Sequence, residues 1–252
     1  MAVENASGNL VAHAHDRGVT TLALDSPANR NALSSALVGE LGERLREADE
    51  DGAVRAVVLT HTGGTFCAGA DLKDPPDPGR LVGLLRQIVD LGKPVVARVD
   101  GHVRAGGLGL LGACDIAAAS TASSSFAFTE VRIGVAPAVI SMPLLPRLDP
   151  RAVARYYLTG ERFDAAEAAR IGLVTVAGDD VDGALAPLLD GLRKASPEGL
   201  AETKKLLTVK VLKAFDRDAE SLTALSARLF GSAHAREGMT AFLERRDAAW
   251  VL

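Results

Sequence analysis

The most informative stretches of this chain are two glycine-rich segments, Gly64-Thr65-Phe66-Cys67-Ala68-Gly69-Ala70-Asp71-Leu72 and Ala105-Gly106-Gly107-Leu108-Gly109. Each segment follows a β-branched, apolar run, and each exposes small-residue backbone where a helix is expected to start. Small residues leave peptide N–H groups open to a ligand oxygen, and a helix N-terminus adds a favourable dipole. Two such donors aimed at one point would form an oxyanion hole, which stabilises negative charge that develops on an oxygen.

The composition is that of a globular protein, and the length fits one large domain or one domain with an appendage. The 252 residues are 48% hydrophobic and 4% aromatic, so the core is built from Ala, Val, Leu and Ile. A net charge of −4 argues against nucleic-acid partners, which require a basic surface. Two cysteines form no disulfide framework, and neither a signal peptide nor a membrane span is recognisable. We therefore expect a cytoplasmic protein with no membrane partner.

Strands and helices are expected to alternate in the first part of the chain. The predicted strands are Val19–Asp25, Ala56–Thr60, Pro94–Val99, Cys114–Ala119 and Phe126–Phe128. Ser34 can cap a helix whose apolar face contains Leu37, Leu41 and Leu45. A second helix is expected over Leu81–Asp90, after a proline-rich loop, and a short, almost wholly apolar and therefore buried one over Gly106–Ala113. This order predicts an α/β core of repeated strand–strand–helix units.

The chain is expected to become helical after about residue 180. The predicted helices are Pro197–Phe215, Asp216–Phe230 and Ala233–Trp250. Two apolar stripes are expected on the first two of them, namely Leu200, Leu206, Leu207, Val211 and Phe215, then Leu222, Leu225 and Leu229. We therefore divide the chain into a core over residues 1–180 and a helical region over residues 181–252. Such a region often packs against a neighbouring subunit, which predicts a symmetric oligomer.

Further motifs occur in a characteristic order along the chain. They are Asn31–Ser34, Phe66–Leu72, Gly106–Leu110 with Cys114–Ile116, Thr129–Pro137, Leu158–Gly160, Ala165–Ala168, Gly172–Val174 and Glu237–Arg246. Together they resemble the crotonase, or enoyl-CoA hydratase/isomerase, superfamily over roughly Val19–Trp250. The resemblance implies a spiral of ββα turns with a C-terminal helical oligomerisation region, which assembles as a homotrimer or a dimer of trimers. It also implies acyl-CoA thioester substrates whose carbonyl oxygen lies between two peptide N–H groups, here those of Ala70 and Gly106.

Glu130 is the expected acid–base residue. Hydratases of this family usually have two glutamates, and this chain has Glu130 at the second position but Gly109 at the first. Because Glu130 follows Phe128 at a predicted strand end, apolar neighbours should raise its pKa and suit it to proton transfer. The stretches Val135–Ser141 and Arg155–Gly160 resemble those of hydratases for branched glutaconyl-CoA, which favours a hydratase. An enoyl-CoA isomerase with one carboxylate, or an inactive acyl-CoA-binding protein, remains an alternative.

The resemblance also assigns substrate-binding positions around these groups. They are Ala68, Asp71, Leu72, Lys73, Gly107 and Pro137. From the sequence alone, Asp71 is more simply a cap at a helix start, and Cys67 and Cys114 are small buried fillers. CoA is part of the substrate, so no separate cofactor is expected. The five histidines lack metal-ligand spacing, so no metal site is expected either.

One motif matches a dinucleotide-binding pattern but lacks the structural context that this function requires. Gly107-Leu108-Gly109-Leu110-Leu111-Gly112 has the G-x-G-x-x-G pattern of dinucleotide-binding turns, and Glu130 lies downstream like a ribose-binding acid. However, the preceding strand is predicted to end near Val99, several residues too early for a tight strand–helix turn. The surrounding helix is also too apolar to face a cofactor. We therefore reject a dinucleotide-binding function.

Overall fold

The computed structural model describes residues 8–252, and its first half repeats one supersecondary unit. Two strands and a helix occur three times in succession, and a fourth pair of strands comes next. The units are β1 (Val11–Asp16), β2 (Val19–Leu24) and α1 (Ser35–Glu50); β3 (Ala56–His61), β4 (Thr65–Cys67) and α2 (Pro78–Asp90); β5 (Val95–Val99), β6 (His102–Arg104) and α3 (Gly106–Ala113); and β7 (Ile116–Ser120) with β8 (Ser125–Ala127). The predicted ββα repetition is therefore confirmed.

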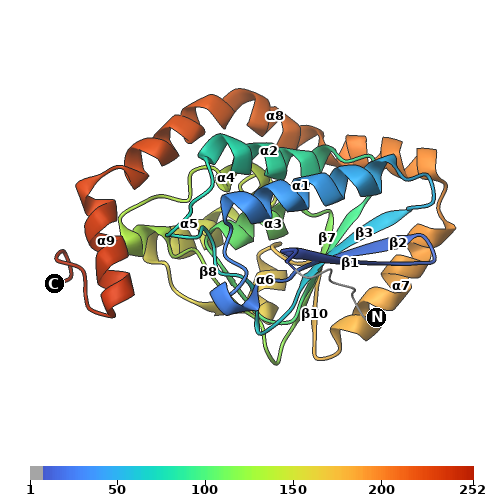
Figure 1. Cartoon of the computed structure of the whole chain (residues 1–252). Coiled ribbons are helices and arrows are strands. Elements are labelled where there is room, and N and C mark those ends of the chain that lie inside the picture. The colour runs from blue at the N-terminus through green and yellow to red at the C-terminus, as the bar shows by residue number, and fades with distance from the viewer. Residues whose placement is uncertain (1–7) are drawn as a thin grey trace.

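The repeated units stack through two sheets. Six strands form one sheet in the order β1-β2-β3-β5-β7-β10, and four form a second in the order β4-β6-β8-β9. From the second unit on, the first strand of each unit joins the larger sheet and its second strand joins the smaller one, always parallel to the unit before. Each unit therefore advances the chain by one strand in both sheets, which produces the expected spiral (Figure 1).

Shorter elements complete the spiral. They are the 3₁₀ helices η1 (Pro27–Asn29) and η2 (Glu130–Ile133), α4 (Ser141–Leu144), α5 (Pro150–Thr159), β9 (Phe163–Asp164), α6 (Ala165–Arg170), β10 (Val176–Gly178) and α7 (Val181–Lys194). Of these, α7 lies in the region that the sequence division assigned to the helical part. It packs Val181 and Leu185 onto the outer face of the larger sheet, against Val58 and Val96. The sheet is thus covered on both faces, which explains its continuous apolar strands.

The core fills the space between the sheets and the helices of the units. Ser34 caps α1, accepting from the N–H of Leu37, and the predicted face of Leu37, Leu41 and Leu45 is fully buried. The helix predicted to start at Leu81 starts at Pro78, where the fixed proline φ suits the first turn and Asp77 is the N-cap. In the described chain, residues 8–252, no helix is both long and apolar enough to cross a membrane.

The C-terminal part differs from expectation in three respects. The helix predicted over Ala233–Trp250 ends at Glu244. One continuous helix of 34 residues, α8 (Pro197–Phe230), replaces the two predicted over this range, because neither Gly nor Pro interrupts it near Phe215. It arches over α2 and leads to α9 (Ala233–Glu244), as Figure 1 shows. The predicted stripe is also wrong in part, because Leu206 and Leu207 are 77% and 72% exposed.

The buried stripe of α8 instead contains Lys204, Thr208, Val211 and Phe215. These positions follow the helical period, but a lysine is not expected on a buried face. Its Nζ forms an ion pair with Asp115 at 2.8 Å and donates to two backbone carbonyl oxygens. Asp115 in turn accepts from the N–H of Val95. This buried network ties the long helix to the spiral.

Candidate active site

Three parallel strands bring the predicted catalytic residues to one edge of the smaller sheet. Ala70 comes shortly after β4, Gly106 after β6 and Glu130 after β8. Because β6 pairs in parallel with both β4 and β8, the carboxyl ends of all three strands meet at the same edge. The N–H of Ala105 continues this pairing by donating to the carbonyl of Ala127. The spiral thus gathers residues that are up to 60 positions apart in the sequence.

The N–H groups of Ala70 and Gly106 are free and adjacent. Ala70 lies in an isolated parallel bridge with Leu33, whose bonds use the carbonyl of Gly69 and the N–H of Asp71. Within residues 8–252, neither the Ala70 N–H nor the Gly106 N–H donates a hydrogen bond. A Cβ placed on Gly106 would lie 3.7 Å from the Ala70 nitrogen. The two amides are therefore near each other and unpaired, which makes them candidates for two donors to one oxygen.

Local backbone strain holds this arrangement. Ala105 has φ 45° and ψ −119°, a conformation that costs a non-glycine residue about 1–3 kcal/mol. Gly69 opposite has φ 94°, and a Cβ there would stand 2.9 Å from the Ala105 Cβ. Position 69 therefore requires glycine for both its conformation and its close approach. The strained Ala105 and the permissive Gly69 meet at the point where the two segments approach each other.

The side chain of Asn31 stabilises the first glycine-rich segment through hydrogen bonds. Its side-chain amide donates to the carbonyls of Thr62 and Thr65, and its Oδ1 accepts from the N–H of Ser26. The residue is fully buried, so these bonds satisfy a polar group that would otherwise destabilise the core. The neighbouring carbonyl of Arg30 accepts from the N–H of Ala68. This explains why the Asn31–Ser34 motif accompanies the glycine-rich segment.

The two glycine-rich segments lead into different structures. A helix, α3, starts at Gly106 as predicted, and its first N–H group faces the site. No helix starts after Ala70, so the prediction of a helix there is wrong, and residues 71–77 form bends and a loop. The cap expected at Asp71 is likewise absent. Asp71 instead accepts from the N–H of Lys73 and from the side chain of Asn29, which turns the chain away from the sheet.

Glu130 is the first residue of η2 and is buried in an apolar environment. Only 7% of it is exposed, and its Oε2 has no hydrogen-bond partner within residues 8–252. Burial raises the pKa of this carboxyl from 4.5 to about 7, as the sequence led us to expect. A carboxyl with such a pKa can both accept and deliver a proton near neutral pH.

Ile140 occupies the space beside Gly109, the position where the resemblance implies a second glutamate. A Cβ on Gly109 would stand 2.5 Å from the Cγ2 of Ile140 and 3.4 Å from the Cδ1 of Leu85. Ile140 is itself only 2% exposed. The absence of a carboxylate at position 109 therefore leaves no empty space, because the aliphatic side chain of Ile140 occupies that place.

The other predicted substrate-binding residues surround this edge in different ways. Leu72 is half-buried, and Lys73 is exposed, with an ammonium group that has no partner within the described residues. Pro137 is buried and its carbonyl accepts from the hydroxyl of Ser141. Gly107 packs against Cys67, where a Cβ would stand 2.7 Å from the cysteine Cβ. Contact of these residues, or of Ala68 and Asp71, with a substrate stays a prediction.

Several polar features lie outside the site. Cys67 and Cys114 are buried fillers as predicted, and burial raises the pKa of each thiol to about 12. Two cavities, of about 240 and 290 Å³, lie beside Arg147 and Lys93, and neither is lined by Ala70, Gly106 or Glu130. No group of His, Cys, Asp or Glu residues in the described part of the chain could hold a metal ion.

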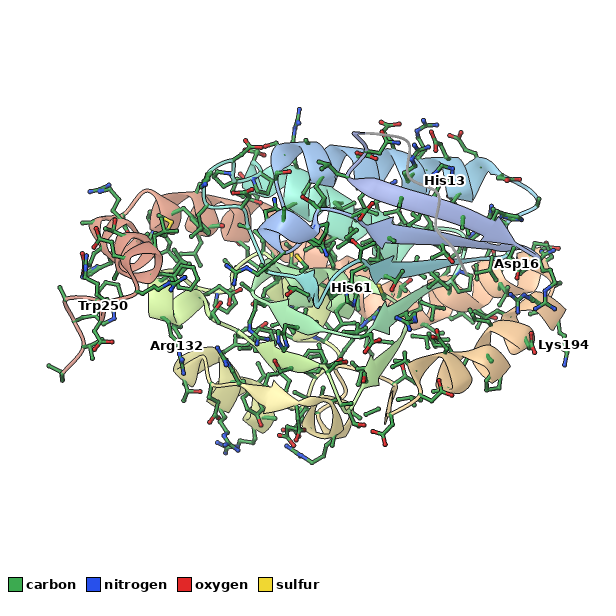
Figure 2. The ribbon with its side chains drawn as sticks, turned by 60° about the horizontal axis from the view of Figure 1, so that its bottom comes forward. His13, Asp16, His61, Arg132, Lys194 and Trp250 are labelled. Carbon is green, nitrogen blue, oxygen red and sulfur yellow. The ribbon has the colours of Figure 1, made fainter. Side chains whose placement is uncertain are left out.

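The outer surface carries ion pairs rather than further site residues. Figure 2 shows Trp250 and Lys194 at opposite ends of the molecule and Arg132 on the side of the C-terminal helices. Arg132 donates from Nε to the carbonyl of Thr159, which joins η2 to the end of α5. Arg246, just after α9, is paired with Glu237 and Glu244.

Sequence reasoning missed three residues at the site. They are Ala105, Ile140 and Tyr157. Ala105 is strained, Ile140 replaces the second carboxylate, and Tyr157 carries a buried hydroxyl without a partner in residues 8–252. No pattern in a single sequence marks an alanine with positive φ. Nor does a single sequence show that, of the adjacent Tyr156 and Tyr157, only the second leaves its hydroxyl unpaired.

Comparison with known proteins identifies the family. The family model for enoyl-CoA hydratase/isomerase matches residues 14–251. Mevalonyl-coenzyme A hydratase sidH of Aspergillus fumigatus is 31% identical over 249 residues, covering 92% of this chain and 91% of the relative. Carnitinyl-CoA dehydratase of Proteus mirabilis is 30% identical over 256 residues, covering 94% and 97%. The crystal structure of an enoyl-CoA hydratase from Mycobacterium avium is 55% identical with a TM-score of 0.91, covering 96% of this chain and 99% of that one. This chain therefore belongs to the enoyl-CoA hydratase/isomerase family.

Proposed function

We propose that this enzyme adds water to the double bond of a 2-enoyl-CoA thioester. The free N–H groups of Ala70 and Gly106 hold the thioester oxygen, and Glu130 transfers the proton. The observation that carries the proposal is the placement of two adjacent unpaired amides and one buried carboxyl at the same sheet edge. The amides supply the oxyanion hole and the carboxyl supplies the acid–base group.

The reaction can proceed with one carboxylate. Glu130 accepts a proton from water while the water oxygen bonds to the β-carbon, and the electron pair of the double bond moves to the thioester oxygen. Glu130 then delivers the proton to the α-carbon, so that H and OH are added in total. Each amide donor is worth about 3–4 kcal/mol of barrier. No separate cofactor takes part, because CoA enters with the substrate.

Turnover of crotonyl-CoA and of a branched glutaconyl-CoA by the wild type and by Glu130→Gln tests this proposal. Glutamine keeps the size and polarity of the side chain but cannot accept or deliver a proton. The kcat of the variant should therefore fall by about 10²–10⁴-fold. Unchanged turnover would mean that another group carries the proton. Relatives in the family are named for different acyl groups, mevalonyl and carnitinyl among them, so we propose the branched substrate only as the first of a panel.

Isomerisation of a 3-enoyl-CoA is the second candidate, and the packing at Gly109 favours it. Because Ile140 fills the place of a second carboxylate, a single glutamate could move a proton between the α- and γ-carbons. Incubation of a 3-enoyl-CoA in heavy water separates the two activities. Isomerisation incorporates deuterium into the 2-enoyl product without the mass of a water oxygen. Hydration is measured in a parallel incubation of crotonyl-CoA, which gains both deuterium and oxygen, because water does not add to the unconjugated 3-enoyl double bond. An acyl-CoA-binding protein without activity would bind the thioester and give neither product.

We further propose that the subunit assembles as a homotrimer or a dimer of trimers. Leu206 and Leu207 on α8, together with Phe242 and Leu243 on α9, expose more than half of their surface. Large apolar side chains exposed on C-terminal helices are typical of subunit interfaces. Sedimentation equilibrium of the wild type and of a Leu206→Glu, Leu207→Glu variant tests this assembly. A mass of one subunit for the wild type would refute it.

A further inference from the structure

A second buried polar group, the hydroxyl of Tyr157, lies near Glu130 without a partner. Tyr157 Oη and Glu130 Oε2 are two of only four buried side-chain N or O atoms in residues 8–252 that make no hydrogen bond. Buried polar atoms are nearly always paired, because each unpaired one destabilises the folded state. Two such atoms in one region indicate that a polar molecule completes them when the enzyme works.

Contacts between α5 and η2 hold the two residues on neighbouring elements. The Tyr157 ring lies against that of Phe128, with 4.5 Å between the ring centroids, and Phe128 precedes Glu130 by two residues. The hydrogen bond from Arg132 Nε to the carbonyl of Thr159 joins the same two elements. Arg132 follows Glu130 by two residues, and Thr159 follows Tyr157 by two residues. The negative charge of Glu130 also acts on Tyr157, since it contributes, after burial, to raising the pKa of the phenol.

The surroundings of Tyr157 leave its hydroxyl available. The Ser141 hydroxyl lies close to that of Tyr157 and counteracts part of the rise in the pKa of the phenol, but the two groups do not meet the geometry of a hydrogen bond. The Ser141 hydroxyl donates to the carbonyl of Pro137 at 2.6 Å instead. Ile140, the preceding residue, closes the place where a second carboxylate would stand. Tyr157 therefore offers, on an element that packs against η2, a hydroxyl without a partner in residues 8–252.

We propose that Tyr157 positions the water that adds to the β-carbon. In this role its oxygen accepts one hydrogen of the water molecule, which directs the other hydrogen toward Glu130. The phenol keeps its own proton throughout, because its raised pKa makes it neither acid nor base at neutral pH. The hydroxyl thereby replaces the orienting function of a second carboxylate. This inference rests on the proposed hydration.

The adjacent Tyr156 provides a matched control. It is on the same helix, and its hydroxyl donates to Glu167 Oε1 at 2.7 Å on a different side of the helix. Tyr156→Phe and Tyr157→Phe therefore remove the same atom from neighbouring residues, one paired and one unpaired. Tyr157→Phe should fold normally, with an equal or higher midpoint of thermal unfolding, because it removes a buried hydroxyl without a partner.

Two reactions distinguish positioning of water from structural damage. Hydration of crotonyl-CoA requires the water, whereas exchange of the α-protons of butyryl-CoA with heavy water requires only the two amides and Glu130. For Tyr157→Phe we expect kcat of hydration to fall about 10–100-fold with little change in KM, the size of one or two lost hydrogen bonds. Exchange should stay within twofold of the wild type. Tyr156→Phe should leave both rates unchanged.

The outcomes for the inference and for the proposed function are separable. Normal hydration by Tyr157→Phe, or an equal loss of hydration and exchange, overturns the role of Tyr157. Loss of both rates in Glu130→Gln, with hydration alone lost in Tyr157→Phe, supports both statements. A wild type that exchanges protons but hydrates no enoyl-CoA refutes the proposed function, whatever the tyrosine variants do.

Discussion

Glu130→Gln should stabilise the folded protein in a way that depends on pH. The fold buries this carboxyl without a partner, and its pKa rises from 4.5 to about 7. At 1.36 kcal/mol for each pKa unit, the ionised form costs the folded state about 3 kcal/mol. Glutamine carries no charge, so the variant avoids this cost. The residue that the proposed reaction requires is therefore one that weakens the fold.

The sign of the effect depends on where the proton is bound. Between pH 4.5 and about 7 the folded chain holds a proton on Glu130 that the unfolded chain has lost. The free energy of unfolding of the wild type therefore falls, relative to that of the variant, as the pH rises through this window. Below pH 4.5 both states are protonated and the difference disappears. Above pH 7 it reaches its full size, about 3 kcal/mol.

Urea denaturation followed by circular dichroism at pH 5, 6, 7 and 8, at one fixed protein concentration, measures this difference. Glu167→Gln is a control of opposite sign, because Arg170 and Tyr156 hold the pKa of Glu167 down to about 2. Loss of the Glu167 carboxylate should lower the free energy of unfolding at neutral pH. This decrease should vanish as the pH falls toward 2. An equal difference between wild type and Glu130→Gln at pH 5 and pH 8 would refute the assignment of a buried, unpaired charge.

Three further predictions concern activity and packing. The kcat/KM for hydration should rise with pH and level off above about pH 7, because the ionised Glu130 accepts the proton of water; a profile that is flat from pH 5 to 9 argues against this role. Gly109→Glu should lower the free energy of unfolding by about 1–3 kcal/mol without raising hydration, since Ile140 fills the space, and adding Ile140→Ala should recover stability in thermal unfolding. Lys204→Ala should cost about 3–5 kcal/mol in urea denaturation because it leaves Asp115 charged and unpaired; a change below 1 kcal/mol would contradict the buried pair.

The parts of the fold that local patterns control were predictable from sequence. The β-branched runs, the Ser34 cap and the apolar stretch Gly106–Ala113 each correspond to one element. The burial and raised pKa of Glu130 could also be expected from its place after Phe128. In each case the neighbours along the chain decide the environment, so that a single sequence carries the information.

Features controlled by contacts between distant segments were not predictable. The buried face of α8 was misjudged because Lys204 looks like a surface residue until Asp115, 89 positions earlier, supplies its partner. Leu206 and Leu207 look like core residues, yet they face outward. Whether position 109 has room for a side chain likewise depends on Ile140, which only folding brings next to it. Local hydrophobicity does not contain this information.

The departures from ordinary packing that concern the reaction are concentrated at one place. Strain at Ala105 and the buried charge of Glu130 are found just after the carboxyl ends of β6 and β8, and the unpaired hydroxyl of Tyr157 is on α5, which packs against η2. Each lowers the stability of the empty enzyme, and each presents a group that a bound thioester and a water molecule would satisfy. Binding energy from the substrate can then offset these costs only when the reacting groups are in place. Under the proposed hydration, a sheet edge that is strained when empty would therefore favour the enolate-like state over the free enzyme.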